Sequence, residues 1–319
     1  MALLEVENLS THFFLRRGTI KAVDHVSFSI EAGETLGLVG ESGSGKSMVA
    51  SSLLRLIAQP GRIVGGAIRF EGVNLLSLDE KQMRSYRGRR MSMILQDPLS
   101  SLNPVLTIED QVGEGIAIHD KLSGAALRDR VIEVLKLVGI PAAEKRLRDY
   151  PHHFSGGMRQ RVVGAIALAC RPQFLIADEP TTSLDVTIQL QYLNLLREIQ
   201  QRDGLAMLFV THDFGVVSKM CDRVAVMYAG MIVETASVRE IFNNPCHPYT
   251  KALIESVPEV DEKVDRLSSI QGQPPSPLAR PKGCPFVTRC PVAMPRCAGE
   301  MPPETKISEQ QQVRCWHYV

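Results

Sequence analysis

The sequence predicts an α/β domain over about residues 1–236, followed by an extension rich in proline and cysteine at 237–319. Short apolar runs alternate with amphipathic stretches in the first part, as in domains whose helices surround a sheet. Runs 35–39, 174–177 and 206–211 are continuously apolar, which favours parallel strands buried on both faces. In the extension, nine of the 19 prolines fall between Pro274 and Pro303, where we expect neither regular helix nor sheet.

The remaining elements follow in chain order. A glycine-rich turn and a helix over Met48–Ile57 come directly after the first apolar run. Apolar residues of the segment 110–148 share one helical face, which predicts an inserted helical subdomain at about 97–160. The runs 224–228 and 231–233 are separated by two residues and predict a tight β-hairpin.

Composition argues against nucleic-acid binding and membrane spanning. Lys and Arg number 36 against 35 Asp and Glu, and aromatic residues make up 5%, so neither a basic surface nor base-stacking platforms are expected. The longest apolar run, Val162–Cys170, has nine residues, whereas a membrane-spanning helix needs about 20. The N-terminal residues do not resemble an export signal. We therefore expect a cytoplasmic protein, or one held at a membrane by a partner, with its seven cysteines not paired as disulfides.

A phosphate-binding loop is predicted between the first strand and the first helix. The stretch 40–47 reads GESGSGKS and fits G-x-x-x-x-G-K-[ST]. Glycines allow backbone N–H groups to surround phosphate oxygens at a helix N-terminus. A lysine in this pattern reaches the β- and γ-phosphates, and the following hydroxyl binds Mg²⁺. The candidate binding residues are Gly40, Ser42, Gly43, Ser44, Gly45, Lys46 and Ser47.

Two carboxylates follow the strand at 174–177. Asp178 and Glu179 stand at the carboxyl end of this strand, where open α/β sheets bind ligands. We expect Asp178 to hold Mg²⁺ and Glu179 to polarise an attacking water. An exposed acidic turn before Pro180 is the alternative, which the phosphate loop makes less attractive.

A serine and two glycines precede the apolar helix near 162–169. Ser155 is well placed to cap this helix, while Gly156 and Gly157 leave the helix end bare for a second anion. The order of phosphate loop, SGG helix and acidic strand end resembles the ATP-binding subunits of ABC transporters. The resemblance covers roughly residues 3–235 and implies a P-loop NTPase of ABC type with a mixed sheet and an inserted helical subdomain. In that family the SGG helix of one subunit closes over ATP held by the other.

The resemblance also implies roles for single residues. Gln96 matches the glutamine that touches Mg²⁺ and links the catalytic core to the helical subdomain, and His212 matches the switch histidine at the γ-phosphate. Asp185, in the run Ser183-Leu184-Asp185, matches the loop that crosses the dimer. Phe13 is a candidate for stacking on adenine, although a core role is equally compatible with its position. Met158 stands where the family pattern has glutamine, so only the serine hydroxyl and backbone N–H groups are carried over.

The extension narrows the resemblance to importers of dipeptides, oligopeptides and nickel. His247-Pro248-Tyr249-Thr250 is similar to the segment that opens the extension in that group. The last 36 residues contain four cysteines, Cys284, Cys290, Cys297 and Cys315. No two of them are spaced as in the C-x₂₋₄-C pairs of zinc sites. Their looser spacing suits an iron–sulfur cluster, and a [4Fe–4S] cluster is implied for some members of the group. Zinc and structural thiols remain the alternatives.

The function implied is hydrolysis of ATP, with Mg²⁺, to drive import of di- or oligopeptides. The expected partners are a second ATPase subunit of a non-identical kind, two transmembrane permeases and an extracytoplasmic binding protein, with no nucleic acid. The expected location is the cytoplasmic face of the inner membrane. Import of nickel or oligosaccharides, a soluble ABC ATPase outside transport, and a metal-sensing interaction module are the competing interpretations.

Overall fold

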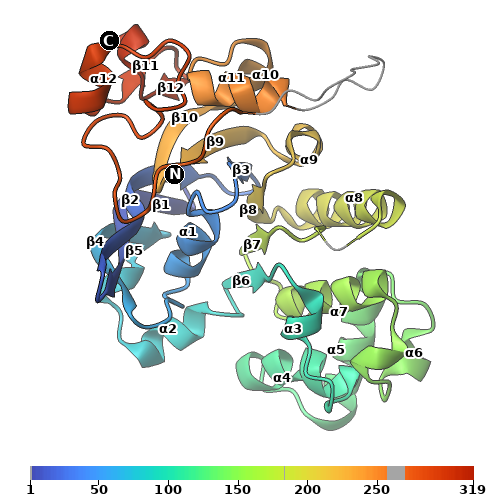
Figure 1. The fold of residues 1–319 in the computed structure, drawn as a ribbon. Coiled ribbons are helices and arrows are strands. Elements are labelled where there is room, and N and C mark those ends of the chain that lie inside the picture. The colour runs from blue at the N-terminus through green and yellow to red at the C-terminus, as the bar shows by residue number, and fades with distance from the viewer. Residues whose placement is uncertain (1, 183, 257–269) are drawn as a thin grey trace. The chain divides into compact units, whose positions relative to one another are not determined.

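The computed structural model describes residues 2–182, 184–256 and 270–319 and divides the chain into two compact units. The first comprises Met1–Ile30, Thr35–Leu76 and Val210–Val319, and the second comprises Glu31–Glu34 and Ser77–Phe209. Figure 1 labels the helices and strands of both units.

The first unit contains two groups of strands with short helices. Its elements are β1 (Leu4–Leu15), β2 (Gly18–Ile30), β3 (Thr35–Val39), α1 (Lys46–Leu53), β4 (Gly61–Phe70), β5 (Val73–Asn74), α9 (Phe214–Met220), β9 (Arg223–Tyr228), β10 (Met231–Ser237), α10 (Val238–Asn243), α11 (Pro248–Glu255), α12 (Pro295–Gly299), β11 (Thr305–Lys306), β12 (Gln312–Val313) and the 3₁₀ turn η3 (Trp316–Tyr318). A further 3₁₀ turn, η1 (Leu75–Ser77), stands at the boundary between the units.

Four antiparallel strands of this unit form a sheet in the order β2-β1-β4-β5. The sequence pattern does not predict this sheet. Register shifts interrupt β1 against both of its neighbours, so the apolar positions do not keep the period of two that marks a half-buried strand.

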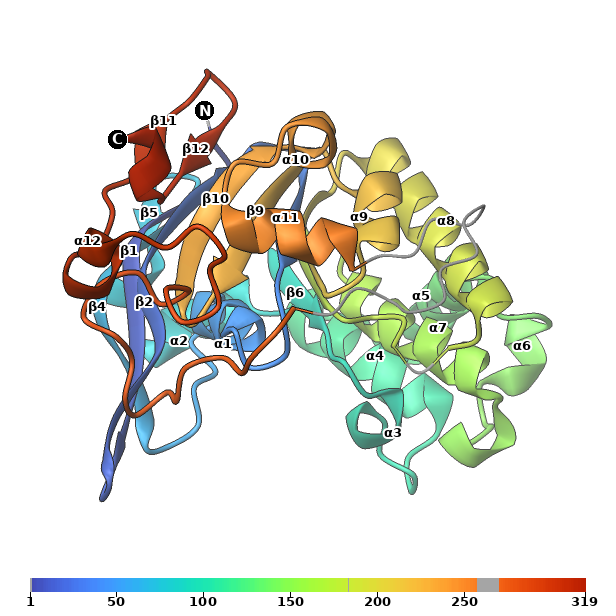
Figure 2. The ribbon, with the colours of Figure 1, turned by 45° about the horizontal axis from the view of Figure 1, so that its top comes forward.

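The other strands of the first unit run in the order β11-β12-β10-β9-β3. The pairing of β3 with β9 is parallel, and β9 and β10 form the expected antiparallel hairpin. The ribbon in Figure 2 shows α10 and α11 beside this hairpin. An apolar cluster packs α9, α10 and α11 with the hairpin and includes Phe214, Val226, Ile241, Tyr249 and Phe286. The C-terminal extension thus shares a hydrophobic core with the strands that adjoin the phosphate loop.

The extension is more regular than the proline content suggests. The prediction that Pro274–Pro303 lacks regular structure is wrong for α12, which begins at Pro295. Proline is tolerated there because the first helical position has no intrahelical partner for its N–H group. Buried Glu234 accepts hydrogen bonds from the backbone N–H groups of Cys246 and His247, at 2.7 and 2.8 Å, and so fixes the start of α11.

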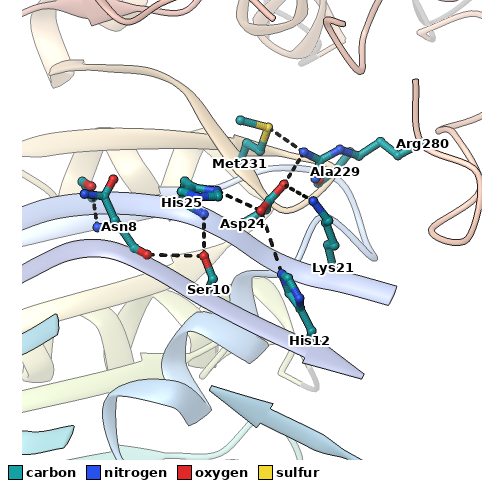
Figure 3. A network of polar contacts seen from close by, with 10 residues as sticks. Asn8, Ser10, His12, Lys21, Asp24, His25, Ala229, Met231 and Arg280 are labelled. Carbon is teal, nitrogen blue, oxygen red and sulfur yellow. Dashed lines mark hydrogen bonds and ion pairs between the residues drawn. The ribbon is translucent and has the colours of Figure 1, made fainter. Parts of the chain in front are cut away.

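A polar network joins the extension to β2 (Figure 3). Arg280 lies in the connection between α11 and α12, and its guanidinium contacts the Asp24 carboxylate on β2 and the Ala229 carbonyl. Lys21 and His25 contact the same carboxylate. Four groups that carry or can carry positive charge, including His12, therefore face one buried aspartate.

The second unit is mostly helical. Its elements are α2 (Glu80–Tyr86), β6 (Met91–Ile94), α3 (Pro98–Ser101), α4 (Ile108–His119), α5 (Gly124–Leu137), α6 (Ala143–Arg146), the 3₁₀ turn η2 (Pro151–His153), α7 (Gly156–Leu168), β7 (Phe174–Asp178), α8 (Val186–Asp203) and β8 (Ala206–Thr211), whose last two residues belong to the first unit. The strands run in the order β8-β7-β6, with β6 and β7 parallel. The apolar face predicted for α5 is buried at Val131 and Leu135.

Candidate active site

The phosphate loop occupies residues 40–45, between the end of β3 and the start of α1. Gly45 has φ +106°, and a Cβ there would lie 2.3 Å from the Ala22 carbonyl oxygen. Glycine is therefore required at this position by both backbone conformation and space. Ser42 and Gly43 at the middle of the loop are exposed, which leaves their backbone open to a ligand.

Polar atoms converge on the inside of this loop. Lys46 Nζ donates to the Gly40 and Glu41 carbonyl oxygens at 2.7 and 3.0 Å, so the ammonium group spans the loop. The buried Ser44 hydroxyl has no hydrogen-bond partner among the described residues. A buried hydroxyl without a partner is costly, and a phosphate oxygen would supply that partner. Ser47, partly exposed in the first turn of α1, follows the lysine. The loop residues fit a bound polyphosphate.

Two other candidates belong to the same unit. His212 is exposed and follows the last residue of β8 directly, while the next residue, Asp213, caps α9 through Gly215 N at 2.7 Å. Phe13 packs closely on Gly61, where a Cβ would lie 2.6 Å from the ring. This contact gives Phe13 a packing role, and its stacking on adenine stays a prediction.

In the second unit the structure brings Gln96 and Glu179 together. Asp178 is the last residue of β7 and is buried, and Glu179 follows with φ +45°. Gln96 Nε2 and Thr182 Oγ1 both donate to Glu179 Oε2 at 3.1 Å. A glutamate with positive φ is uncommon, and such strain is concentrated at functional sites. Because the Gln96 nitrogen faces Glu179, its amide oxygen points elsewhere and can bind a cation.

The SGG segment begins α7. Ser155 caps the helix by accepting from Met158 N at 3.4 Å, so the structural role considered for it is present. Gly157 packs against α8, since a Cβ there would lie 2.7 Å from Ile188 Cγ2, whereas a Cβ on Gly156 would meet no described atom within 4 Å. Of the two glycines, therefore, only Gly156 has open space at the position of a Cβ.

The loop before α8 contains Asp185. This residue caps the helix by accepting from Ile188 N at 3.0 Å. Ser183 lies outside the described residues. Contact of Asp185 with a second subunit stays a prediction.

The four cysteines of the extension line one pocket, together with Phe286 and Trp316. All four are free thiols, and burial raises the pKa of Cys284 to about 11. Among the described residues, no three His, Cys, Asp or Glu side chains are grouped so that they would hold a metal ion. This geometry therefore does not support a site for a single metal ion at the cysteines.

No sequence pattern predicts the partners of Glu41, the second residue of the phosphate loop. Arg289 forms a bidentate ion pair with the Glu41 carboxylate, and the Tyr249 hydroxyl accepts a hydrogen bond from the Glu41 backbone N–H. In the sequence, Tyr249 is marked only by the family motif His247-Pro248-Tyr249-Thr250. One arginine lies between each pair of consecutive cysteines (Arg289, Arg296 and Arg314), so no feature of the sequence singles out Arg289.

The described residues include no helix that is both long and apolar enough to cross a bilayer.

Comparison with known protein families matches both parts of the chain. Residues 23–182 match the ABC transporter family, and residues 233–297 match the oligopeptide/dipeptide transporter C-terminal region. The chain is 47% identical over 317 residues to the oligopeptide transport ATP-binding protein AppD of Bacillus subtilis, covering 99% of this chain and 97% of AppD. It is 46% identical over 315 residues to the dipeptide transport ATP-binding protein DppD of Haemophilus influenzae, covering 99% and 95%.

Solved structures agree in fold. A dimeric ATP-binding cassette in a post-hydrolysis state with ADP and phosphate superposes with a TM-score of 0.67 at 26% identity, covering 74% of this chain and 99% of the cassette. CbiO1 from Clostridium perfringens, part of an ABC transporter complex, gives 0.64 at 28% identity, covering 76% and 91%. The ABC ATPase fold expected from the resemblance is confirmed. The chain belongs to the ABC transporter ATP-binding family, in the group that carries the oligopeptide/dipeptide transporter C-terminal region.

Proposed function

We propose that this chain is the ATP-hydrolysing subunit of an ABC importer for short peptides. The observation that carries the proposal is the phosphate loop, with its spanning Lys46 ammonium and its buried, unpartnered Ser44 hydroxyl. The peptide cargo is supported by relatives named as dipeptide and oligopeptide transport ATP-binding proteins, which match nearly the whole chain.

Lys46 and the loop amides bind the phosphates, and the Ser47 hydroxyl, the Gln96 amide oxygen and the Asp178 carboxylate are the assigned Mg²⁺ ligands. When bound, Mg²⁺ neutralises charge on the β- and γ-phosphate oxygens. Glu179 orients and polarises the attacking water, and His212 contacts the γ-phosphate. Catalysis by these residues is a matter of position and charge, because phosphoryl transfer requires little covalent chemistry from the protein.

The site is completed by a second ATPase subunit, for which we propose a non-identical relative. Each subunit closes over the ATP that is held by the phosphate loop of the other. In this chain the residues that close over the partner's ATP are Ser155, Gly156, Gly157 and Asp185. Open space before Gly156 supports this assignment. We assign residues 1–236 to the ATP-binding domain, with the subdomain at about 97–160 facing the membrane partners, and 237–319 to the extension.

An importer ATPase of this kind works with permeases and a substrate-binding protein. We place the chain as a peripheral subunit on the cytoplasmic face of the membrane, bound to two transmembrane permeases, with an extracytoplasmic binding protein delivering the peptide.

The test is peptide uptake by the complete complex in proteoliposomes. The intact complex is expected to hydrolyse ATP faster, and to accumulate labelled dipeptide, when binding protein and peptide are present. Lys46→Ala is expected to abolish both activities, because the ammonium that spans the phosphate loop is lost. Stimulation by a nickel chelate or an oligosaccharide, with none by peptides, would overturn the assignment of cargo.

For the cysteine pocket we propose a [4Fe–4S] cluster. Four thiols from distant positions lining one pocket support the proposal. Each thiolate of such a cluster binds a different iron, so the sulfurs stand further apart than around a single ion. Cys284, Cys290, Cys297 and Cys315 would hold the cluster.

Anaerobic purification followed by visible absorption and iron and zinc analysis tests this proposal. Broad visible absorption is expected, which is lost in Cys290→Ser and retained in Cys246→Ser. Cys246 is a matched control because it is also buried in the extension but does not line the pocket. Zinc, or no metal, in the anaerobic protein would overturn the cluster assignment.

A further inference from the structure

Glu41, the second residue of the phosphate loop, is held by an arginine 248 positions later in the chain. Arg289 Nη1 and Nη2 donate to the two carboxylate oxygens of Glu41 at 2.7 and 2.9 Å. The Arg289 side chain is only 2% exposed. Its N–H groups also donate to the Ile270 and Gln271 carbonyls and to the Tyr228 hydroxyl, so the guanidinium is held by the extension and by β9. A bidentate ion pair fixes the orientation of the carboxylate as well as its distance from the guanidinium.

The backbone of Glu41 is held at both ends of the residue. Its N–H donates to the Tyr249 hydroxyl at 2.8 Å, and its carbonyl accepts from Lys46 Nζ at 3.0 Å. Tyr249 is fully buried, and its ring packs on Tyr228 and Phe286. Displacement of Glu41 would therefore also displace an anchor of the lysine that binds phosphate.

The charge of Glu41 makes this contact necessary. A carboxylate in a loop that binds a polyanion repels the ligand unless a positive charge neutralises it. Arg289 supplies that charge from a buried position, where screening by dissolved salt is weak. Arg289 contacts neither the phosphate loop lysine nor any atom assigned above to the reaction, so it acts through Glu41.

We propose that Arg289 and Tyr249 of the C-terminal extension are positioning residues of the phosphate loop, which hold Glu41 so that Lys46 and the loop amides are arranged for MgATP. This inference rests on the proposed ATPase function. It gives the extension a direct role in nucleotide affinity, through contacts that lie entirely within the first unit.

The test is steady-state ATP hydrolysis by the complete complex with variants of this chain. Arg289→Ala is expected to raise KM for MgATP on the order of tenfold, while kcat at saturating MgATP changes less than about twofold. Arg289→Lys should retain part of the affinity, because lysine keeps the positive charge but cannot form the bidentate pair. Tyr249→Phe, which removes only the hydroxyl, is expected to raise KM by a smaller factor.

Arg296→Ala is the matched control. Arg296 also lies in the extension and stacks on Trp316, with 3.4 Å between its Cζ and the ring centroid, so its loss perturbs the extension without touching the loop. Its KM for MgATP is expected to be unchanged. An equal rise in KM for Arg296→Ala and Arg289→Ala would overturn the proposal, because the effect would then come from general loosening of the extension.

A double-mutant cycle with Glu41→Gln isolates the pair. If Arg289 acts through the Glu41 charge, Arg289→Ala is expected to have a much smaller effect on KM in the Glu41→Gln background. Independent effects in the two backgrounds, or an unchanged KM in Arg289→Ala, would overturn the proposal while leaving the ATPase assignment intact. Failure of the unmodified complex to bind MgATP would instead refute the proposed function.

Discussion

Arg280 Nη2 lies 2.5 Å from Asp24 Oδ2, and this contact joins the C-terminal extension to β2 across 256 positions of sequence (Figure 3). The Asp24 side chain is 5% exposed and that of Arg280 is 19% exposed. Removing one partner of a buried ion pair leaves the other charge without compensation, and this is more damaging than the loss of a surface pair.

Arg280→Ala is therefore expected to lower the free energy of unfolding of the first unit by about 3 kcal/mol. This value is at the low end of the range of about 3–5 kcal/mol for breaking buried pairs, because Lys21 and His25 remain beside Asp24. Urea unfolding followed by fluorescence of Trp316, the one tryptophan of the chain, measures the change in the extension itself.

Arg314→Ala is the control for this measurement. It breaks the more exposed pair of Arg314 with Glu304, also in the extension, and is expected to cost less than about 1 kcal/mol. Equal destabilisation by the two variants would show that burial of the Asp24 pair has no energetic importance.

The same pair predicts how stability responds to acid. Burial raises the pKa of Asp24, but the charges of Arg280 and Lys21 and the hydrogen bond from His25 outweigh it and hold the pKa below the ordinary value of 3.8. The stabilisation is therefore complete above pH 3.8 and is lost as pH falls through the lower, folded-state pKa. Unfolding curves at a series of pH values below 4 should show a steeper loss of stability in the original protein than in Asp24→Asn. Parallel curves would contradict this reading.

Local patterns were enough to predict the phosphate loop and the strands around it. The loop needs glycines and a lysine at fixed spacing, and buried strands are continuously apolar, so both are visible within a few residues. The sequence predicts the first helix over Met48–Ile57, whereas α1 covers Lys46–Leu53. It ends early because Arg55 takes a left-handed conformation with φ +54°.

Contacts between distant parts of the chain were beyond prediction. Neither Arg280 nor Arg289 belongs to a pattern that names its carboxylate partner, since each pair depends on how the extension folds back. The contact between Gln96 and Glu179 is partly predictable from the sequence. The order of strands suggests that their ends are neighbours, but only the structure shows the hydrogen bond.

Glu179→Gln tests the assignment of the residue that polarises water. Glutamine keeps an oxygen that can accept from Gln96 and Thr182, so the local geometry and MgATP binding should persist. The amide has no basic carboxylate, and kcat is expected to fall about 10²–10⁴-fold. Hydrolysis and nucleotide binding by the complete complex measure the two effects separately. Glu309→Gln, at an exposed position, is the control, and normal turnover in Glu179→Gln would show that another group acts on the water.

The two glycines that begin α7 allow the role of the partner subunit to be separated from folding. Alanine at Gly157 would place its Cβ 2.7 Å from Ile188 Cγ2, so Gly157→Ala is expected to destabilise the second unit by about 1–3 kcal/mol through overpacking. Alanine at Gly156 meets no described atom within 4 Å, and Gly156→Ala should leave unfolding unchanged.

In the proposed dimer, however, the space in front of Gly156 is where the ATP of the opposite subunit lies. The methyl group of Gly156→Ala is then expected to weaken ATP-dependent association of the two ATPase subunits, measured by sedimentation of the hydrolysis-deficient Glu179→Gln background with MgATP. A dimer of unchanged affinity in Gly156→Ala would mean that the start of α7 does not face nucleotide. A loss of association that is accompanied by a loss of thermal stability would show instead that Gly156→Ala acts on folding. The second outcome is not expected, because the described residues leave room for the methyl group in the monomer and only a ligand or partner can exclude it.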